Sequence, residues 1–504
     1  MNALNTYLAK TPSEKINTEM VAYVANLTSV AKVAPEIVSS IVQEFDDQRS
    51  NLKLIASENY CSLSTQLAMG NLLTDKYAEG FANARFYEGC DNVDSIEARA
   101  CALACELFGA EHAFVQPHSG ADANMVAFWG ILQARIQVPE LEILKVKNPD
   151  ALSQEDWETI RTKLGNQSIL GLNLAAGGHL THGYRHNVSG KMFDAHSHGV
   201  SAETGLYDYD AIEAQAIEVQ PLILIAGYSA YPRAINFKRM REIADKVGAV
   251  LMCDMAHFSG LVAGGVFKGE ESPFGYADVV TSTTHKTLRG PRGGIILSTK
   301  EFGPFMDKGC PLVLGGPLSH VMAAKAVAFK EALSDDFKEY AQNVVDNAAA
   351  LAAELQNLGM VITTGGTENH LMLVDVTPFG VSGRQGASAL RDCGITCNKN
   401  GIPFDKLSPM ITSGLRLGTP AMTSLGMGVD DMKEIASIVK LVIENTQSGV
   451  VASGPNAGKP SKINYLIADS VKEEALGRVK LLLAKYPLYP ELDLDFLKEQ
   501  FLIN

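Results

Sequence analysis

The sequence lacks several features that mark secreted, membrane or nucleic-acid-binding proteins. Its 504 residues contain no apolar run long enough to span a membrane, and its first residues show no basic segment followed by an apolar core. We therefore expect neither a signal peptide nor a membrane partner. The formal net charge is −14, an acidic excess that argues against nucleic acid as a partner. An anionic ligand would have to be met by local groups such as Arg292 and Arg416.

Cysteine patterns that indicate disulfides or zinc are also missing. The eight cysteines are scattered without a Cys-x-x-Cys pair, and no spacing of cysteine and histidine fits a zinc site. We expect reduced thiols in a cytoplasmic protein and no bound metal. There are no internal repeats. What is present is a 46% hydrophobic and 20% charged composition, typical of a globular protein, and a length that predicts two or more domains.

Alternating apolar strands and helices predict an α/β core. The helix expected over 236–247 stops at Gly248 and is followed directly by the apolar strand 249–253, while a helix beginning at Val93 stops at Gly109. This alternation is typical of a large sheet with helices on both faces.

The chain is expected to divide into four parts. Residues 1–50 would form a helical N-terminal arm, and residues 51–334 a large domain whose charged, turn-rich stretch 134–168 is a surface insertion. A long helix and short strands predict a smaller α+β domain over 335–446. Residues 447–504 are expected to be a linker and tail, because the stretch after Ser448 is rich in Gly, Pro and Ser.

The chemistry is most concentrated between Thr281 and Arg292. The β-branched run 279–284 predicts a buried strand, which is followed by His285 and Lys286. Apolar surroundings and nearby positive charge would disfavour the ammonium form, so Lys286 suits an amine that attacks a carbonyl. For the residue taken alone, a strand-end lysine reaching toward water is the simpler alternative.

A carboxylate is expected beside this lysine. Asp254 follows the apolar strand 250–253 and precedes Lys286 by 32 residues, about one crossover unit, so both side chains are expected at one edge of the sheet. A buried carboxylate there needs a cation or hydrogen-bond donors. A lone aspartate would serve equally well as a helix cap.

Three further segments carry groups suited to a planar, anionic ligand. Ser119, Gly120 and Ala121 precede an apolar helix, and their N–H groups suit a phosphate, although helix capping also explains a Ser-Gly turn. His179 follows two glycines that let a flat ligand approach its ring. Arg416 lies among small residues and suits a carboxylate. A hydrogen-bonded histidine and a surface arginine are the simpler alternatives.

Together these groups predict a pyridoxal phosphate site. From about residue 40 to about residue 446, apart from the insertion, the chain resembles the serine hydroxymethyltransferase family. The most specific matches are Thr283–Gly294 (TTHKTLRGPRGG) and Gly177–Gly183 (GGHLTHG). The resemblance implies a fold-type I pyridoxal-phosphate enzyme with a large mixed sheet and a smaller α+β domain. Such an enzyme interconverts L-serine and glycine through an imine with the cofactor and passes the one-carbon unit to tetrahydrofolate. A cytoplasmic homodimer with shared active sites is implied.

The resemblance also implies roles for individual residues. The cofactor would be held by Ser119, Gly120, Ala121, His179, Ser229, Asp254, His257, Lys286, Gly315 and Gly316. Catalytic roles would belong to Lys286, Glu79, His285, Tyr87 and Tyr77, and substrate binding to Ser57, Arg416, Tyr87 and Glu79. Folate would contact Leu174, Gly178, Leu180 and Asn400. Lys286 would form the imine and Asp254 would pair with the pyridine nitrogen. The family's equivalents of Tyr77, Glu79 and Tyr87 reach the site from the neighbouring subunit.

The chain departs from the family pattern at four positions. Phe81 and Phe86 replace tyrosines, Ala176 replaces a histidine near the folate, and Leu314 replaces a glutamine before a Gly-Gly-Pro. These changes bear on folate affinity and on side reactions such as threonine cleavage. The alternatives are another enzyme of this fold, such as a threonine aldolase or an aminotransferase, and a relative that keeps the fold as a non-catalytic binding protein.

Overall fold

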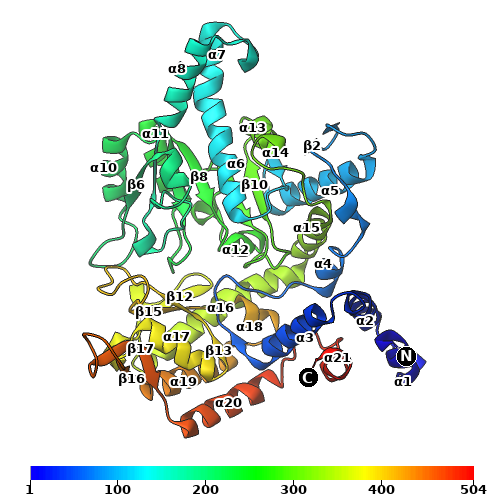
Figure 1. The fold of residues 1–504 in the computed structure, drawn as a ribbon. Coiled ribbons are helices and arrows are strands. Elements are labelled where there is room, and N and C mark those ends of the chain that lie inside the picture. Colours follow the sequence, from blue (N-terminus) through cyan, green and yellow to red (C-terminus); the bar gives the residue numbers. More distant parts are fainter. Residues whose placement is uncertain (1, 504) are drawn as a thin grey trace.

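In the computed structural model, which describes residues 2–503, a seven-stranded sheet forms the centre of the molecule (Figure 1). Its strands in spatial order are β4 (His112–Phe114), β10 (Gly294–Ser298), β9 (Val279–Thr283), β8 (Val250–Asp254), β7 (Ile223–Gly227), β5 (Ser168–Leu172) and β6 (Asp194–His198). The five strands from β9 to β6 are parallel, and β10 runs antiparallel to both of its neighbours. The predicted mixed α/β fold is confirmed.

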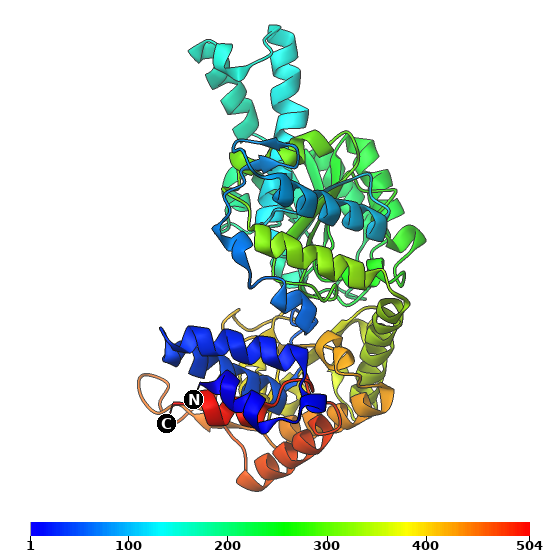
Figure 2. The same ribbon diagram turned by 90° about the vertical axis from the view of Figure 1, so that its right-hand side faces the viewer.

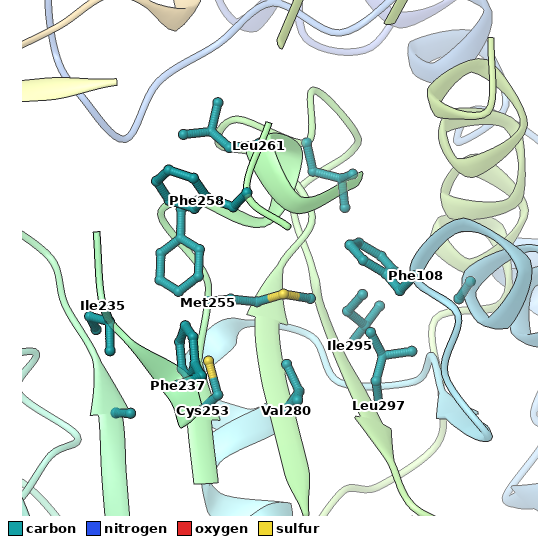
Figure 3. Packing of buried hydrophobic residues seen from close by; sticks show 14 of the residues in the cluster. Phe108, Ile235, Phe237, Cys253, Met255, Phe258, Leu261, Val280, Ile295 and Leu297 are labelled. Carbon is teal, nitrogen blue, oxygen red and sulfur yellow. The ribbon is translucent and has the colours of Figure 1, made fainter. Parts of the chain in front are cut away.

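Both faces of this sheet are buried, because successive side chains point to opposite sides of each strand. On β8, Leu251 and Cys253 belong to one apolar cluster, and Val250 and Met252 belong to the other. Figure 3 shows part of the first cluster, where Phe108 and neighbouring apolar side chains cover the sheet. The helices on that face are α5 (Asp91–Phe108), α10 (Tyr209–Val219), α11 (Phe237–Val247), α12 (Ser259–Ala263) and α15 (Ser319–Ala332), and those on the other are α6 (Gly120–Leu132) and α13 (Gly303–Asp307).

The predicted helix stops are confirmed at two glycines. Gly109 ends α5 and Gly248 ends α11, and each has φ +67°. Glycine enters this left-handed conformation without steric cost, so the chain can turn sharply from each helix toward the next strand.

A second, four-stranded antiparallel sheet forms the smaller α+β unit. Its elements are β11 (Val361–Ile362), β12 (Leu371–Asp375), β15 (Gly414–Gly418) and β14 (Asn398–Asn400), with helices α16 (Asp335–Asn357), α17 (Gly383–Asp392), α18 (Pro420–Ser424) and α19 (Val429–Glu444). Strand β1 (Leu52–Lys53) pairs in parallel with β13 (Ile395–Thr396). Leu52 and Leu54 therefore pack in the core of this smaller unit, although they lie early in the chain.

The two ends of the chain share an apolar core of their own. Figure 2 shows the N-terminal helices and the last helix side by side. The elements are α1 (Ala3–Lys10), α2 (Thr18–Ala31), α3 (Pro35–Ser50) and α21 (Leu494–Phe501). Arg49 of α3 donates to the backbone oxygens of Leu488, Tyr489 and Leu492 at 2.7, 2.6 and 2.8 Å. We propose that the large unit, the small unit and this arm–tail unit are the parts into which the chain divides, because each has a buried cluster of its own.

The stretch expected to be a linker is ordered into a hairpin. Strands β16 (Gln447–Val450) and β17 (Pro460–Leu466) pair in antiparallel fashion and lead into α20 (Asp469–Leu483). Gly454 and Gly458, which suggested flexibility, have positive φ angles of +87° and +79° in the connecting loop. Helix α20 of the tail packs against the small unit, where its Val479 and Leu482 are buried.

The insertion projects from the large unit (Figure 1). Helix α6 continues through a π-helical turn at Gln133–Gln137 into α7 (Val138–Leu144), and α8 (Gln154–Gly165) returns toward β5. No helix within residues 2–503 is long and apolar enough to cross a bilayer. The remaining short elements are α4 (Leu63–Leu67), β2 (Gly80–Phe81), β3 (Ala84–Arg85), α9 (Ser189–Met192) and α14 (Gly309–Leu312).

Candidate active site

Asp254 and Lys286 meet at the carboxyl edge of the large sheet, as the spacing predicted. Asp254 is the last residue of β8 and pairs in register with Thr281 of the adjacent parallel strand β9. Lys286 follows β9 by three residues, and its Nζ donates to Thr283 Oγ1 at 3.1 Å. Burial lowers the pKa of Lys286 to about 8, with Arg416 and Arg292 adding to the effect against Asp254. A large fraction of the amine is therefore neutral near pH 8.

Asp254 is a buried carboxylate surrounded by donors. Its Oδ2 accepts from Asn124 Nδ2 at 2.9 Å and from His182 Nε2 at 3.0 Å, and its Oδ1 accepts from the Ala256 N–H at 3.1 Å. Burial opposes ionisation, but the hydrogen bonds and the nearby imidazoles hold the pKa of Asp254 below its usual range. The end of β8 thus presents a fixed negative charge.

His179, His182 and Asp254 are close enough together to resemble a metal site, since their ligand atoms lie within 4.8 Å of one another. These atoms already bind protein groups, however. His182 Nε2 bonds to Asp254, and His179 Nδ1 lies 2.7 Å from Thr181 Oγ1. We propose no metal there.

The turn before α6 has the geometry of an anion site. Ser119 caps the helix, its Oγ accepting from the Asp122 N–H at 3.1 Å. Within residues 2–503, the N–H groups of Gly120 and Ala121 in the first turn find no acceptor. A Cβ at Gly120 would lie 2.7 Å from Thr283 Cγ2, so glycine lets the helix start against β9. Free N–H groups at a helix N-terminus favour a phosphate.

His179 is held as a neutral ring beside Asp254. It follows Gly177, whose φ is +106°, and Gly178, where a Cβ would lie 1.9 Å from the backbone oxygen of Leu172. Burial lowers the pKa of His179 to about 4. A neutral, flat side chain of this kind suits stacking on an aromatic ligand.

Arg416 crosses from the small unit to the large one. From β15 its Nη1 donates to the Ser229 backbone oxygen at 2.6 Å, and its Nε donates to Asn398 Oδ1 at 3.1 Å. Burial lowers the pKa of Arg416 to about 10, which leaves the group charged at neutral pH. It forms no ion pair with any carboxylate of the described chain, so a cation is available for an anionic ligand.

Two buried histidines also join the units. His257 Nδ1 lies 3.1 Å from His370 Nε2, and burial lowers the pKa of both rings, that of His370 to about 3. His370 Nδ1 has no partner among the described residues. An unpaired acceptor costs less than an unpaired N–H, so the proton belongs on His370 Nε2. His257 then accepts at Nδ1 and carries its own proton on Nε2.

Ser57 and His285 border a cavity of about 940 Å³ between the arm and the large unit, which Arg292 also lines. Burial lowers the pKa of His285 to about 3, with Lys286 contributing, and its Nδ1 accepts from the Gly293 N–H at 3.4 Å. His285 is therefore neutral beside the lysine.

The site around Asp254, Lys286 and Arg416 is called the crevice from here on. Other predicted residues of the described chain make no hydrogen bond to these groups. Tyr87 donates to Glu79 Oε2 at 2.8 Å, and Tyr77 donates weakly to Oε1 at 3.5 Å. The two tyrosines are 45% and 58% exposed. A Cβ at Gly316 would lie 3.4 Å from the Tyr77 ring, so Gly315 and Gly316 belong to this exposed group.

The residues expected to contact folate are also spread out. Leu174 lines a cavity of about 290 Å³ together with His179, and Leu180 is 44% exposed nearby in the chain. Gly178 packs tightly on Leu172, as described above. Asn400 lies on β14 in the small unit, where its Nδ2 donates to the Gly401 oxygen at 2.7 Å.

Sequence reasoning missed several residues that complete the crevice. Asn124 and His182 bind Asp254, Thr283 binds Lys286, and His370 binds His257. His182 lies in the quoted Gly-Gly-His-Leu-Thr-His-Gly motif, and Asn124 lies one helical turn after Gly120, so both carried a local signal. His370 comes from another sheet and carried none.

Comparison with known proteins points to one family. A family model described as serine hydroxymethyltransferase matches residues 30–145 and 158–439, leaving a gap within the projecting insertion. The chain is 59% identical over 500 residues to a protein of Treponema pallidum named serine hydroxymethyltransferase, covering 99% of this chain and 86% of that protein. Proteins of the same name from Mycolicibacterium smegmatis and Cutibacterium acnes are 55% and 52% identical, covering 95% and 94% of this chain and 96% of each relative.

Proposed function

Because this chain belongs to the serine hydroxymethyltransferase family, we propose that the crevice around Lys286 is where it carries out the reaction of that family. The enzyme depends on pyridoxal phosphate and converts L-serine and tetrahydrofolate reversibly to glycine and 5,10-methylenetetrahydrofolate. The assignment of the site depends on one observation: Lys286, an amine of lowered pKa, follows strand β9, directly beside the strand that ends in the ionised Asp254.

The groups of the crevice fit pyridoxal phosphate. The carboxylate of Asp254 would hold a proton on the ring nitrogen, the neutral His179 would lie against the ring, and the N–H groups of Gly120 and Ala121 would bind the phosphate. Lys286 would supply the amine that links to the aldehyde. When bound, the cofactor provides a conjugated ring that draws electrons from the bonds at the substrate Cα.

The substrate groups follow from the remaining charges. Arg416, with no carboxylate partner of its own, would hold the serine carboxylate together with Ser57. Fixing that carboxylate sets which bond at Cα breaks. His257 carries its proton on Nε2 and would donate to an anionic oxygen from the other side. Folate would lie near Leu174, Gly178, Leu180 and Asn400.

The working unit is proposed to be a homodimer in which each site takes groups from both chains. Glu79, Tyr77 and Tyr87 form an exposed cluster that makes no hydrogen bond to the crevice of its own chain. An acid held between two tyrosines is well suited to move a proton at the substrate hydroxyl, but it needs a site to serve. The crevice of a neighbouring copy supplies that site. Gly315 and Gly316 lie beside the same cluster in its own chain.

Mixed dimers test both the roles and the sharing. Lys286→Ala and Glu79→Gln subunits should each be inactive with serine and tetrahydrofolate. In a heterodimer of the two, one site carries both defects and the other carries neither. Random mixing after subunit exchange should therefore restore about a quarter of wild-type turnover. No recovery, with heterodimers demonstrated by mass, would show that each site is built from one chain.

The cytoplasm is the proposed compartment. All eight cysteines are free thiols, four of them buried, and none is paired in a disulfide within the described chain. Thiols of this kind persist in a reducing compartment. Fractionation of cells that express the enzyme, followed by the serine assay, tests this assignment.

A further inference from the structure

One buried lysine has no part in the chemistry above. Lys325 of α15 is 1% exposed, and its Nζ donates to three backbone oxygens: Val115 at 2.5 Å, Pro117 at 2.9 Å and Gly294 at 2.8 Å. These oxygens come from the residue after β4, from the turn that leads into α6, and from the first residue of β10. A single nitrogen on α15 thus joins two segments that are far apart in the sequence, the stretch between β4 and α6 and the start of β10.

Three converging acceptors favour the charged form of this lysine. A neutral amine has two N–H donors, whereas an ammonium has three, and three acceptors converge on Lys325. It forms no ion pair within residues 2–503, since its neighbour Glu97 is already paired with Arg85. Burial lowers the pKa of Lys325 to about 7, against the pull of Glu97 and Asp122. All three hydrogen-bond acceptors of the amine are carbonyl oxygens, which are also ligands of hard metal ions in proteins.

These two segments frame the turn assigned to the phosphate. The Gly294 N–H donates to the Pro117 oxygen at 2.9 Å, and a Cβ at Gly294 would lie 2.2 Å from the Ser119 oxygen. A Cβ at Gly293 would lie 2.5 Å from Lys325 Cε. The backbone around Ser119 is therefore packed directly on this arrangement. Without a central cation, three carbonyl dipoles would point at one another and push the segments apart.

We propose that the ammonium group of Lys325 holds the phosphate-binding turn in shape. It binds the three carbonyl oxygens in the place that a dissociable monovalent cation would otherwise occupy. Lys325 is a positioning residue, since it touches neither substrate nor cofactor. The inference depends on the assignment of Ser119–Ala121 to the phosphate. One consequence is that the wild-type enzyme binds its cofactor equally well whichever monovalent cation is in solution.

Chemical rescue tests this proposal. Lys325→Ala leaves a hole lined by three carbonyl oxygens that ammonium, methylammonium or potassium can enter and tetramethylammonium cannot. Cofactor is removed from the purified enzyme and titrated back by visible absorbance in each chloride salt at equal ionic strength. In tetramethylammonium the variant should bind pyridoxal phosphate about 10- to 100-fold more weakly than wild type. Ammonium or methylammonium should restore affinity by about tenfold.

Two matched variants control the experiment. Lys330→Ala removes an exposed lysine from the same helix and should behave as wild type in every salt. Lys325→Met fills the hole with an apolar chain, so it should bind weakly in every salt with no rescue. This second variant also keeps the test valid if Lys325→Ala does not fold.

Three results would overturn the proposal. The first is wild-type affinity of Lys325→Ala or Lys325→Met in tetramethylammonium. The second is a weakened Lys325→Ala, folded by circular dichroism, that no cation rescues, because a merely structural lysine predicts that outcome. The third is cation-dependent binding of pyridoxal, which lacks the phosphate and should show no cation dependence. Equal cation dependence for both aldehydes would place the error in the assignment of the phosphate turn.

Discussion

Acid should destabilise the cofactor-free enzyme through His198, a buried histidine that has no assigned part in the chemistry. His198 ends β6 at the edge of the large sheet, is 3% exposed, and donates from Nδ1 to the Gly199 oxygen at 3.1 Å. Its Nε2 is sealed without a partner among the described residues, and its ring meets the Tyr207 ring edge-on, 5.1 Å between centroids. Burial lowers the pKa of His198 from 6.5 to about 4.

The sign and size of the effect follow from proton binding. Between pH 6.5 and about 4 the unfolded chain binds a proton at His198 that the folded protein does not. The free energy of unfolding therefore falls as pH falls through this window, by about 1.4 kcal/mol per pH unit for one proton. Between pH 7 and pH 5 this one residue should cost the folded state about 2 kcal/mol, a large share of a typical net stability.

Urea titrations of the wild type and His198→Phe from pH 8 to pH 5 measure this difference. The phenyl ring keeps the contact with Tyr207 and removes the titrating group. At pH 8 the variant should be less stable by about 1 kcal/mol, because the Gly199 oxygen loses its donor. From pH 7 to pH 5 it should lose about 2 kcal/mol less than wild type. His186→Gln changes an exposed histidine and serves as the control. Parallel curves for wild type and His198→Phe would refute the reasoning.

Three further predictions concern the active site. Lys286→Ala should lose the visible absorbance of the lysine-bound cofactor, whereas Glu79→Gln should keep that absorbance and lose serine turnover; normal turnover by Glu79→Gln would contradict its proposed role. Arg416→Gln should raise KM for serine by about 10- to 100-fold, since charge-assisted hydrogen bonds contribute about 1.5–3 kcal/mol. Binding of ethanolamine, which lacks the carboxylate, should change little, and an equal loss for both would argue against the assigned contact. The rate at which pyridoxal phosphate attaches to the cofactor-free enzyme should rise with pH and level off above about 8, because the neutral Lys286 amine is the reacting form and its pKa is lowered. Stopped-flow absorbance measures this profile, and a rise that continues to the ordinary lysine pKa of 10.5 would contradict it.

Local signals predicted the parts of the fold that local physics controls. Gly109 and Gly248 end helices because their left-handed conformation is available to glycine, and the alternation of apolar strands and helices followed directly. The placement of Asp254 and Lys286 at one edge of the sheet was predictable because one crossover unit brings successive parallel strands side by side. These inferences needed only neighbours in the chain and a general rule of topology.

Contacts between residues far apart in the chain could not be predicted from the sequence. His370, which directly precedes β12, reaches His257 in the large unit, and Lys325 binds oxygens from two separate segments. Nothing in the spacing of these residues indicates such meetings. The hairpin at 447–466 was mistaken for a linker because its Gly and Pro residues indicate a turn, whereas the strand pairing depends on packing against α17.

The joint core of the arm and the tail has a consequence for synthesis. Val24, Val42 and Phe45 leave the ribosome early, but their apolar partners Leu497 and Phe501 are translated last. At about 20 residues per second, the early helices wait roughly half a minute with their apolar faces uncovered. Nascent chains should therefore bind holdase chaperones at their N-terminal helices. The two ends of the chain should pack together only after release from the ribosome.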